Sequence, residues 1–476
     1  MQNYTSLTQV HIAYFQSFLE PSQLIIEDKE LLQKYGKDET EDLLYTPEIV
    51  LFPTTTQQVS TILAYCYDQH IAVTPRGAGT GLSGGALPVC SGVVVAMAKM
   101  NKILEIDTNN LQVIVEPGVI TQVLQDAVIE KGLFYPPDPA SKGSCFIGGN
   151  IAHGSGGPRA LKYGVTKDYV LNLEVVLANG SIIHTGARTL KNSTGYNLTQ
   201  LMVGSEGTLG IVTKIYLKLI PYPTQRVLLL ASFDSLYKAC EAVSSFFIAG
   251  IVPSAVEFME RNAVDWVVKY IPEITVSLPE SAVAFLLIEV DGNELDTLYK
   301  QAEQINTILE QYECIDVLLA DTEAQKEQLW KLRRTIGEAV KANSVYKEED
   351  SVVMRASLPQ LITGVKSIGD KYKFESVCYG HAGDGNLHIN IIKGNLTQQQ
   401  WNEEIPQAIR EIFELCKQLG GTISGEHGIG WVQKEYMDII FPAHHLQLLS
   451  AVKNAFDPTN ILNPNKIVPA AFSINS

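Results

Sequence analysis

Glycine is concentrated in two short stretches of the N-terminal half, and no other feature of the sequence restricts the local backbone as strongly. Five of the eleven residues from Pro75 to Gly85 are glycine, and so are six of the fifteen from Gly143 to Gly157. Such density lets backbone N–H groups converge without Cβ clashes, which is how loops bind phosphate groups. Two such loops predict a site for a phosphate-bearing cofactor. For either loop alone, the alternative is a structural loop with several tight turns.

The first stretch contains the motif Gly79-x-Gly81-x-x-Gly84, whose spacing is typical of dinucleotide-binding Rossmann folds. In those folds the motif opens a helix. Here it continues as Gly84-Gly85-Ala-Leu-Pro88, which is a poor helix start. The chain also contains no Walker phosphate-binding sequence. We therefore exclude a Rossmann domain and a Walker-type nucleotide site.

Length and charge limit the class of protein. The 476 residues predict two to four domains, at roughly 150 residues per domain. The chain is 46% hydrophobic and 18% charged, which excludes a disordered chain, a coiled coil and a disulfide-stabilised miniprotein. Its 52 acidic and 36 basic residues give a formal net charge of −16. This balance argues against duplex nucleic acid as a partner, because nucleic acid attracts Lys and Arg.

Cysteine spacing and the N-terminus indicate the compartment. The seven cysteines are scattered and include no Cys-x-x-Cys pair, which excludes a zinc knuckle and favours a reducing compartment. The N-terminus lacks the basic and apolar regions of a signal peptide, and no apolar run reaches the length of a transmembrane helix. We predict a cytoplasmic protein and leave open a peripheral position at a membrane.

Apolar periodicity predicts the main elements. The helical spacing of Val59, Ile62, Leu63 and Cys66 predicts a helix over residues 57–69. Short strands surround it, and Ala178-Asn179-Gly180 predicts a hairpin between strands 170–177 and 181–184. Beyond the prolines at 221 and 223, longer helices alternate with strands such as 282–289 and 387–392.

These changes in pattern predict the domain boundaries. The predicted segments are an N-terminal helical extension (1–44), a domain of two subdomains (45–222, divided into about 45–110 and 111–222), a second domain (223–455) and a tail that packs back on an earlier domain (456–476).

Three of the nine histidines lie in two glycine-rich segments, Gly380–Asn390 and Gly425–Gly430. The turn between His381 and His388 allows the two imidazoles to meet. Together with the carboxylate of Glu426 they form a ligand set for a divalent transition metal that leaves coordination positions open. His427 is then placed to act as a general base. The alternative is three unrelated histidines, each satisfied by backbone hydrogen bonds.

Six segments together resemble one family closely: PRGAGTGLSGG, CFIGGNIAHGSGGPRALKYGVTKDYV, LMVGSEGTLGIVT, GHAGDGNLHIN, GEHGIG and DPTNILNPNKI. They resemble the FAD-linked oxidases of the vanillyl-alcohol-oxidase superfamily. Within it they are similar to the branch of D-lactate dehydrogenase, the glycolate oxidase flavin subunit and D-2-hydroxyglutarate dehydrogenase. The resemblance runs from about Tyr45 to Pro469. It implies an α+β chain with a two-part FAD-binding domain of the vanillyl-alcohol-oxidase (PCMH) type, and an α+β substrate (cap) domain with an antiparallel sheet.

The resemblance also implies which residues contact FAD. The backbone of the first glycine loop would hold the pyrophosphate, and the other segments would line the flavin and its ribityl chain. The implied residues are Pro75, Arg76, Gly77, Ala78, Gly79, Thr80, Gly81, Ser83, Gly84, Pro137, Asp138, Ser141, Gly148, Gly149, Asn150, Gly156, Glu206, Gly210 and Ile211. Relatives with covalently bound flavin carry a histidine in the first glycine loop. This loop has none, so we predict noncovalent FAD.

For the metal-containing branch, the resemblance implies that His381, His388 and Glu426 hold a divalent metal, Zn or Mn. It makes His427 the catalytic base and places Asn390 next to the substrate or the ion. Arg333 matches an arginine that binds the substrate carboxylate, which suits the paired N–H donors of a guanidinium. The alternative for Arg333 is a position on the surface of a helix.

The chain departs from the family pattern at three places. His153 stands where relatives often have an amide or acidic residue, and Met354 stands where a proline is usual. A substrate-binding lysine of the hydroxyglutarate branch aligns ambiguously with Lys347 or Glu348. That ambiguity weakens the hydroxyglutarate interpretation, because a second substrate carboxylate requires a cation.

The implied reaction is oxidation of a D-2-hydroxy acid, D-lactate or glycolate, to the 2-oxo acid by hydride transfer to flavin N5, assisted by the metal. The chain has no iron–sulfur or haem cysteine pattern. Electrons would therefore pass to an external quinone, cytochrome, electron-transfer flavoprotein or partner subunit, and a homodimer stays open. Two alternatives remain: a flavin-dependent non-redox transferase of the same superfamily, and a metal-dependent hydrolase.

Overall fold

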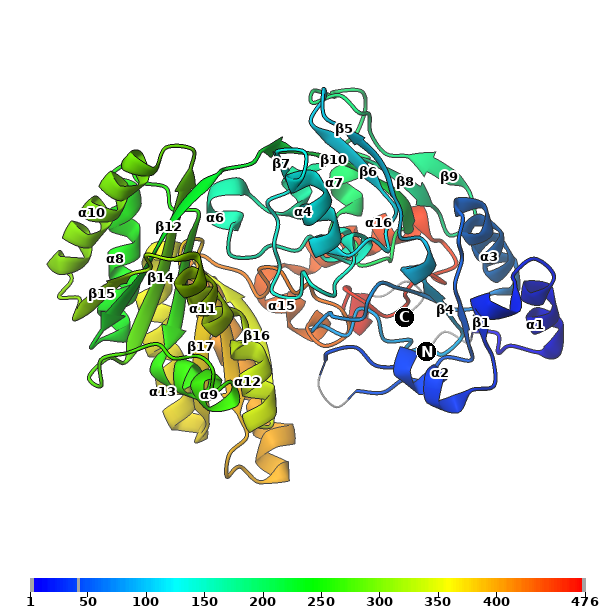
Figure 1. Ribbon diagram of the computed structural model, residues 1–476. Coiled ribbons are helices and arrows are strands. Elements are labelled where there is room, and N and C mark those ends of the chain that lie inside the picture. Colours follow the sequence, from blue (N-terminus) through cyan, green and yellow to red (C-terminus); the bar gives the residue numbers. More distant parts are fainter. Residues whose placement is uncertain (1–3, 41–42, 473–476) are drawn as a thin grey trace. The chain divides into compact units, whose positions relative to one another are not determined.

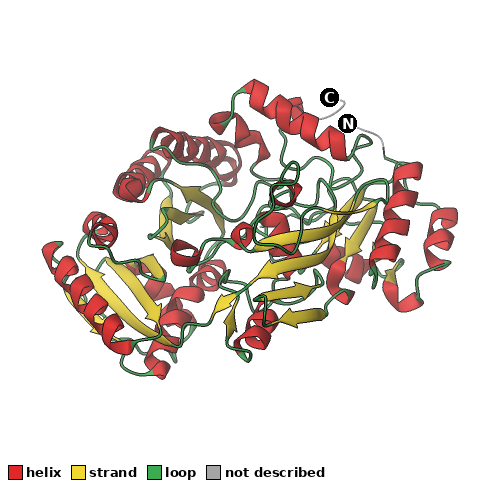
Figure 2. Ribbon diagram, turned by 90° about the horizontal axis from the view of Figure 1, so that it is seen from above, coloured by secondary structure: helices red, strands yellow, loops and turns green. Residues whose placement is uncertain are grey.

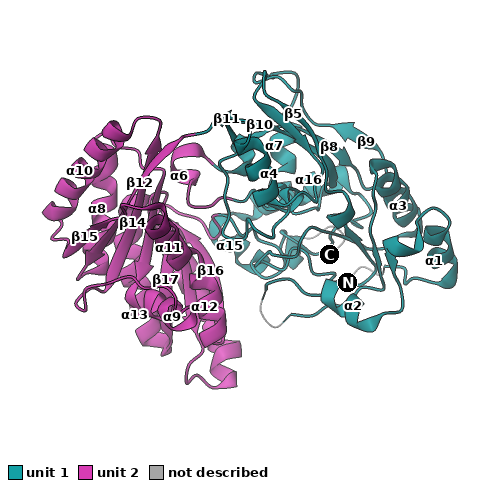
Figure 3. Cartoon of the chain, in the orientation of Figure 1, with its two compact units in different colours: residues 1–155, 165–222, 426–476 teal, residues 156–164, 223–425 magenta. Residues whose placement is uncertain are grey.

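The structure, a computed structural model, describes residues 4–40 and 43–472. The chain forms two compact units (Figure 3). Unit 1 contains the described residues up to Ser155, residues 165–222 and those from Glu426 onward; unit 2 contains residues 156–164 and 223–425. The chain passes from unit 1 to unit 2 between Tyr222 and Pro223, at the predicted domain boundary. It returns to unit 1 between Gly425 and Glu426, so Glu426 and His427 belong to unit 1 rather than to the segment 223–425.

The first sheet of unit 1 has the strand order β1-β2-β4-β3, with β1 antiparallel to β2 and the other pairs parallel. Figure 1 labels β1 and β4. Its strands are β1 (Leu24–Ile25), β2 (Ile49–Leu51), β3 (Val73–Arg76) and β4 (Val93–Ala96). Helix α3 (Thr56–Gln69) connects β2 to β3, and the Thr55 side chain caps it by accepting a hydrogen bond from the backbone N–H of Gln58. The four predicted apolar positions of α3 are all buried, which confirms the helix and its buried face.

Both ends of the described chain contribute to unit 1. Helices α1 (Gln9–Gln16) and α2 (Lys29–Tyr35) precede the first long strands, and Phe15 is fully buried in the same core as β2 and β3. Near the C-terminus, Asn463 N donates to Val73 O at 2.7 Å, and Leu462 is buried in that core. The N-terminal segment is therefore part of the first sheet and its core.

The second sheet of unit 1 is antiparallel, with the order β5-β6-β10-β8-β9. Its strands are β5 (Ile103–Asp107), β6 (Gln112–Val115), β8 (Val170–Val176), β9 (Ile182–His184) and β10 (Ile211–Lys218). The pairing of β8 with β9 confirms the hairpin at Asn179-Gly180. Because β5 pairs with β6, the change of sheet falls between β4 and β5, earlier in the chain than residue 110.

The remaining strands and α-helices of unit 1 are short apart from α4 and α16. They are α4 (Thr121–Ile129), β7 (Leu133–Phe134), α5 (Ile147–His153), α7 (Leu198–Met202), β11 (Ile220–Pro221), α15 (Met437–Ile440) and α16 (Ala443–Phe456). Strands β7 and β11 pair with each other.

Unit 2 is built on a seven-stranded antiparallel sheet of order β15-β12-β14-β13-β17-β18-β16. The strands are β12 (Gln225–Phe233), β13 (Ala255–Glu260), β14 (Ala284–Gly292), β15 (Asp316–Leu319), β16 (Tyr346–Val352), β17 (Glu375–His381) and β18 (Asn386–Ile392). The helices are α6 (Ala160–Tyr163), α8 (Leu236–Ile248), α9 (Arg261–Tyr270), α10 (Leu295–Gln311), α11 (Glu323–Arg334), α12 (Ile336–Asn343), α13 (Leu358–Tyr372) and α14 (Ile405–Gln418).

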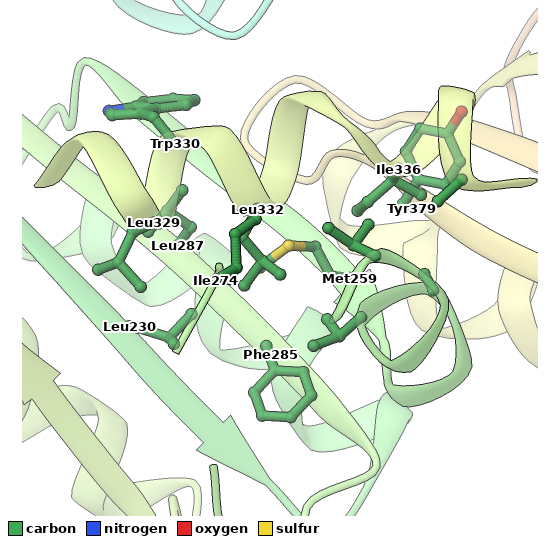
Figure 4. Close-up of a cluster of buried hydrophobic side chains, with 14 of the residues drawn as sticks. Leu230, Met259, Ile274, Phe285, Leu287, Leu329, Trp330, Leu332, Ile336 and Tyr379 are labelled. Atoms are coloured by element: carbon green, nitrogen blue, oxygen red, sulfur yellow. The ribbon is translucent and has the colours of Figure 1, made fainter. Parts of the chain in front are cut away.

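Helices cover both faces of this sheet, so its central strands are apolar at successive positions. In β14, Phe285 and Leu287 point into a core shared with Trp330 of α11 and Ile336 of α12 (Figure 4). Leu286 and Ile288 alternate with them and are also buried, on the face where α8 and α10 contact β12 and β14.

The mixture of helices with largely antiparallel sheets confirms the predicted α+β class (Figure 2). Among the residues that the structure describes, no helix has both the length and the apolar composition that crossing a bilayer requires.

Candidate active site

The first glycine loop connects β3, which ends at Arg76, to β4, which begins at Val93. Gly79 and Gly84 have φ angles of 77° and 74°, a left-handed conformation that favours glycine. The segment after Gly84 contains no helix before β4. This confirms that the glycine motif does not belong to a Rossmann fold.

Two cavities within unit 1 lie beside the glycine-rich segments. Both are lined by Gly77, Ala86, Gly149 and His153, so they adjoin each other.

Most of the residues predicted to contact FAD line these cavities. The residues on the first cavity are Pro75, Arg76, Gly77, Gly148, Gly149, Glu206, Gly210 and Ile211. Those on the second are Gly77, Ala78, Gly79, Thr80, Gly81, Ser141, Gly149 and Asn150.

Five predicted FAD residues line neither cavity. Pro137 O accepts a hydrogen bond from Gln125 Nε2 at 2.9 Å, and Asp138 is buried beside it in the chain. Ser83 and Gly84 contact the segment around Trp431, and Gly156 belongs to unit 2.

The glycines leave room where a bulky cofactor requires it. A Cβ atom added at Gly149 meets no atom within 4 Å, although Gly149 lines both cavities. The wall is therefore open because a side chain is missing, and a planar ring system fits such a surface. These residues suit FAD, whose phosphates the glycine backbone can bind without Lys or Arg side chains.

We expect Gly149→Val to remove FAD without unfolding the protein, because the added methyl groups project into open space that the cofactor needs. The purified variant should contain at least about tenfold less flavin and keep the circular dichroism of the unaltered protein. Gly143→Val is the matched control, since a Cβ at Gly143 also meets nothing within 4 Å and Gly143 lines neither cavity. Equal flavin loss in both variants would contradict the assignment.

Glu426 and His427 both line the second cavity, on the same unit as the glycine loops. The backbone that carries them is bound to the first loop: Ser83 Oγ donates to His427 O at 3.0 Å, and Trp431 N donates to Ser83 O at 2.8 Å. Ser83 therefore holds the segment of the predicted base against the glycine loop.

Glu206 also holds this segment. Its Oε1 accepts a hydrogen bond from Ile429 N at 2.8 Å, and its Oε2 accepts one from Gly430 N at 2.7 Å. Burial raises the pKa of Glu206, while the nearby His153 and the two backbone amides oppose that rise. Two N–H donors, one to each oxygen, suit the carboxylate form.

In unit 2, His381 ends β17 and His388 lies in β18, and the Gly-Asp-Gly-Asn turn joins the two strands as a hairpin. The two imidazole rings are buried, 5.4 Å apart between centroids, with their planes at 83°. The structure therefore brings these two predicted ligands together, as the turn suggested.

A carboxylate that the sequence reasoning missed orients His381. His381 Nδ1 lies 2.8 Å and 2.9 Å from the two oxygens of Glu257, which is fully buried in β13 opposite His381. This bond fixes the proton on Nδ1 and leaves Nε2 as the basic nitrogen, the arrangement common behind metal-binding histidines. The only sequence signal is a carboxylate inside the apolar strand AVEFME.

Arg333 is also bound to Glu257. Its Nη2 lies 2.7 Å from Glu257 Oε2, and its guanidinium lies 5.0 Å from the centre of the Tyr379 ring. Arg333 is only 4% exposed, so the alternative of a helix-surface arginine is wrong. Its Nε is buried and has no hydrogen-bond acceptor among the described residues, which leaves a donor for a ligand.

Other predicted positions lie on this hairpin and on β16, the strand that pairs with β18. Asn390 is fully buried, and its Nδ2 donates to Val377 O at 3.3 Å. Glu348 of β16 lies with Oε1 3.4 Å from His388 Nδ1, so a carboxylate accompanies this histidine as well. Lys347 lies over the Trp401 ring, 5.4 Å from its centre.

The sequence matches two protein families. Residues 47–186 match the FAD binding domain, and residues 222–467 match the C-terminal domain of FAD linked oxidases. The glycolate oxidase subunit GlcD of Bacillus subtilis (strain 168) is 42% identical over 436 residues, which are 91% of each chain. The D-lactate dehydrogenase of Anaerostipes hadrus is 36% identical over 471 residues, which are 98% of each chain.

A solved structure, p-cresol methylhydroxylase with substrate bound, has the same fold. It matches with a TM-score of 0.79 at 18% identity, over 99% of this chain and 98% of that one. This confirms the predicted PCMH-type fold, and the family matches confirm FAD as the cofactor. The chain belongs to the FAD-linked oxidase family and is a FAD-dependent dehydrogenase or oxidase of the D-lactate, glycolate or D-2-hydroxyglutarate type.

Proposed function

We propose that this enzyme oxidises a small D-2-hydroxy acid, D-lactate or glycolate, to the 2-oxo acid, and that noncovalent FAD and a divalent metal take part. The observation that carries the proposal is the pair of buried histidines with Glu257 behind His381, since an orienting carboxylate is what a metal-binding histidine needs.

The proposed ligands are His381, His388 and Glu426, and the proposed metal is Zn or Mn. Two imidazoles and one carboxylate suit either ion. Chain connectivity supports the third ligand. Gly425 N donates to Asp350 Oδ2 at 2.8 Å, and Asp350 is the register partner of His388. Glu426 directly follows Gly425, so it is one peptide bond away from an amide that is fixed to the strand beside His388.

When bound, FAD supplies the hydride acceptor and the metal supplies a Lewis acid that favours the alkoxide form of a substrate hydroxyl. Arg333 binds the substrate carboxylate and thereby orients C2 and its hydroxyl. A ring nitrogen of His427 takes the hydroxyl proton. The cavity that His427 lines is one of the two that we assign to FAD, which puts the base beside the proposed cofactor site.

The charges near His388 favour a monocarboxylate over 2-hydroxyglutarate. Glu348 places a carboxylate beside His388, where a second substrate carboxylate would be repelled. Lys347 is held over Trp401.

Electrons leave to an external acceptor, since the sequence contains no iron–sulfur or haem cysteine pattern.

The test is an anaerobic screen of the purified protein with glycolate, D-lactate, L-lactate and D-2-hydroxyglutarate, followed by the visible absorbance of the flavin. We expect rapid bleaching with D-lactate or glycolate and release of the 2-oxo acid. Bleaching by D-2-hydroxyglutarate alone would contradict the substrate assignment. Absence of bleaching with all four acids would favour a non-redox transferase, and a colourless protein would favour a hydrolase.

A further inference from the structure

The segment Ser424–Gly430 carries both Glu426 and His427, and a buried carboxylate binds its backbone on each side of them. On the N-terminal side, Gly425 N and Ser424 Oγ donate to Asp350 Oδ2 at 2.8 Å and 2.9 Å. On the C-terminal side, Ile429 N and Gly430 N donate to the two oxygens of Glu206. Hydrogen bonds to ionised acceptors are roughly twice as strong as neutral ones.

Both carboxylates are fixed by the surrounding protein. Asp350 is 3% exposed, lies in β16, and accepts a hydrogen bond from Asn386 Nδ2 at 2.6 Å. Glu206 is 6% exposed, and its backbone N donates to Ala152 O at 2.8 Å. Its φ of 51° is rare for a residue with a side chain, and such a conformation persists only where its surroundings determine it.

Within unit 1, the backbone at Gly428 and Gly430 also fits closely against its neighbours. A Cβ at Gly428 would lie 2.8 Å from both Glu206 Oε1 and His153 Nδ1, and a Cβ at Gly430 would lie 2.1 Å from Ser83 O. A side chain at Gly430 would displace the segment, because the neighbouring atom is backbone, and one at Gly428 would displace either the segment or the side chains of Glu206 and His153. Its glycines are therefore needed for the close approach to Glu206 and Ser83.

We infer that Glu206 and Asp350 are positioning residues that fix the backbone on either side of Glu426 and His427. This inference rests on the proposed roles of Glu426 and His427. It gives Glu206 a different task from the predicted FAD contact, because each of its oxygens accepts a backbone amide of the Ile429–Gly430 pair. A base must lie within hydrogen-bond reach of the proton it takes, and a misplacement of about 1 Å can cost on the order of 10² in rate.

The test uses Glu206→Ala and Glu206→Gln in the FAD-containing protein, with hydrogen exchange followed by mass spectrometry. In Glu206→Ala we expect exchange at the amides of Ile429 and Gly430 to become about ten- to a hundredfold faster, because two bonds to a charged acceptor are lost. Glu206→Gln keeps one acceptor oxygen, so its exchange rates at these amides should lie between those of Glu206→Ala and those of the unaltered protein. The rate of substrate-driven flavin reduction, measured per bound FAD, should fall in the same order.

Asp457→Asn is the matched control. Asp457 is another fully buried carboxylate of unit 1, and it accepts hydrogen bonds from Ile461 N and Leu462 N. Its substitution should speed exchange around Leu462 and leave residues 427–430 and the reduction rate unchanged.

Unchanged exchange at 427–430 in Glu206→Ala would overturn the inference, and so would faster exchange with an unchanged reduction rate. Faster exchange at residues 427–430 together with slower flavin reduction in Asp457→Asn would also overturn the inference, since the effect would then be general. Failure of the proposed function is distinguishable, because it would appear as full activity in a His427 variant whatever the exchange data show.

Discussion

Replacing His427 by alanine should slow reduction of the flavin by D-lactate by about 10²–10⁴-fold, the usual cost of removing a general base. FAD should be retained, because the glycine loops that we expect to bind it are unchanged, and the metal should be retained on its own three ligands. The measurement is the rate of anaerobic bleaching in a stopped-flow spectrometer. His444→Ala is the control, since His444 is an exposed histidine of α16. Bleaching at the full rate in His427→Ala would refute the role of the base.

Replacing Arg333 by lysine should raise the KM for D-lactate by about ten- to a hundredfold, because lysine cannot present the paired N–H donors that bind a carboxylate. Lysine is the informative substitution, since it keeps a cation beside Glu257. An alanine would leave that buried carboxylate without its guanidinium partner, at a cost of about 3–5 kcal/mol in stability.

The control for this variant is Arg334→Lys, on the next residue of α11, where the guanidinium lies 4.8 Å from the centre of the Trp330 ring. Steady-state rates with D-lactate and an artificial electron acceptor give KM and kcat for both. A raised KM in Arg334→Lys, with Arg333→Lys unchanged, would contradict the assignment of the carboxylate site.

The local elements could be predicted because they depend on nearby residues. Apolar positions at helical spacing predicted α3 and its buried face, and Asn179-Gly180 predicted the β8–β9 hairpin. The pairing of β6 with β10, and of β1 with β2, depends on contacts between strands that are distant in the sequence rather than on local pattern. The change of sheet before β5 and the inclusion of the N-terminal segment in the first sheet could therefore not be predicted.

The candidate site divides in the same way. A tight turn in the sequence brought His381 and His388 together, and the glycine density marked the cavities. Glu257 escaped prediction because its contact with His381 spans 124 positions and depends on the register of β13 against β17. The burial of Arg333 likewise follows from the packing of α11 on the sheet, which no local pattern records.

Removal of the metal tests the central claim most directly. The protein would be dialysed against a chelator, assayed for bound metal and FAD, and mixed anaerobically with D-lactate. We expect the metal-free protein to keep its flavin, and D-lactate to reduce that flavin at least about 10²-fold more slowly. Addition of Mn²⁺ or Zn²⁺ should restore the rate. Flavin bleaching at the full rate in demonstrably metal-free protein would contradict the account.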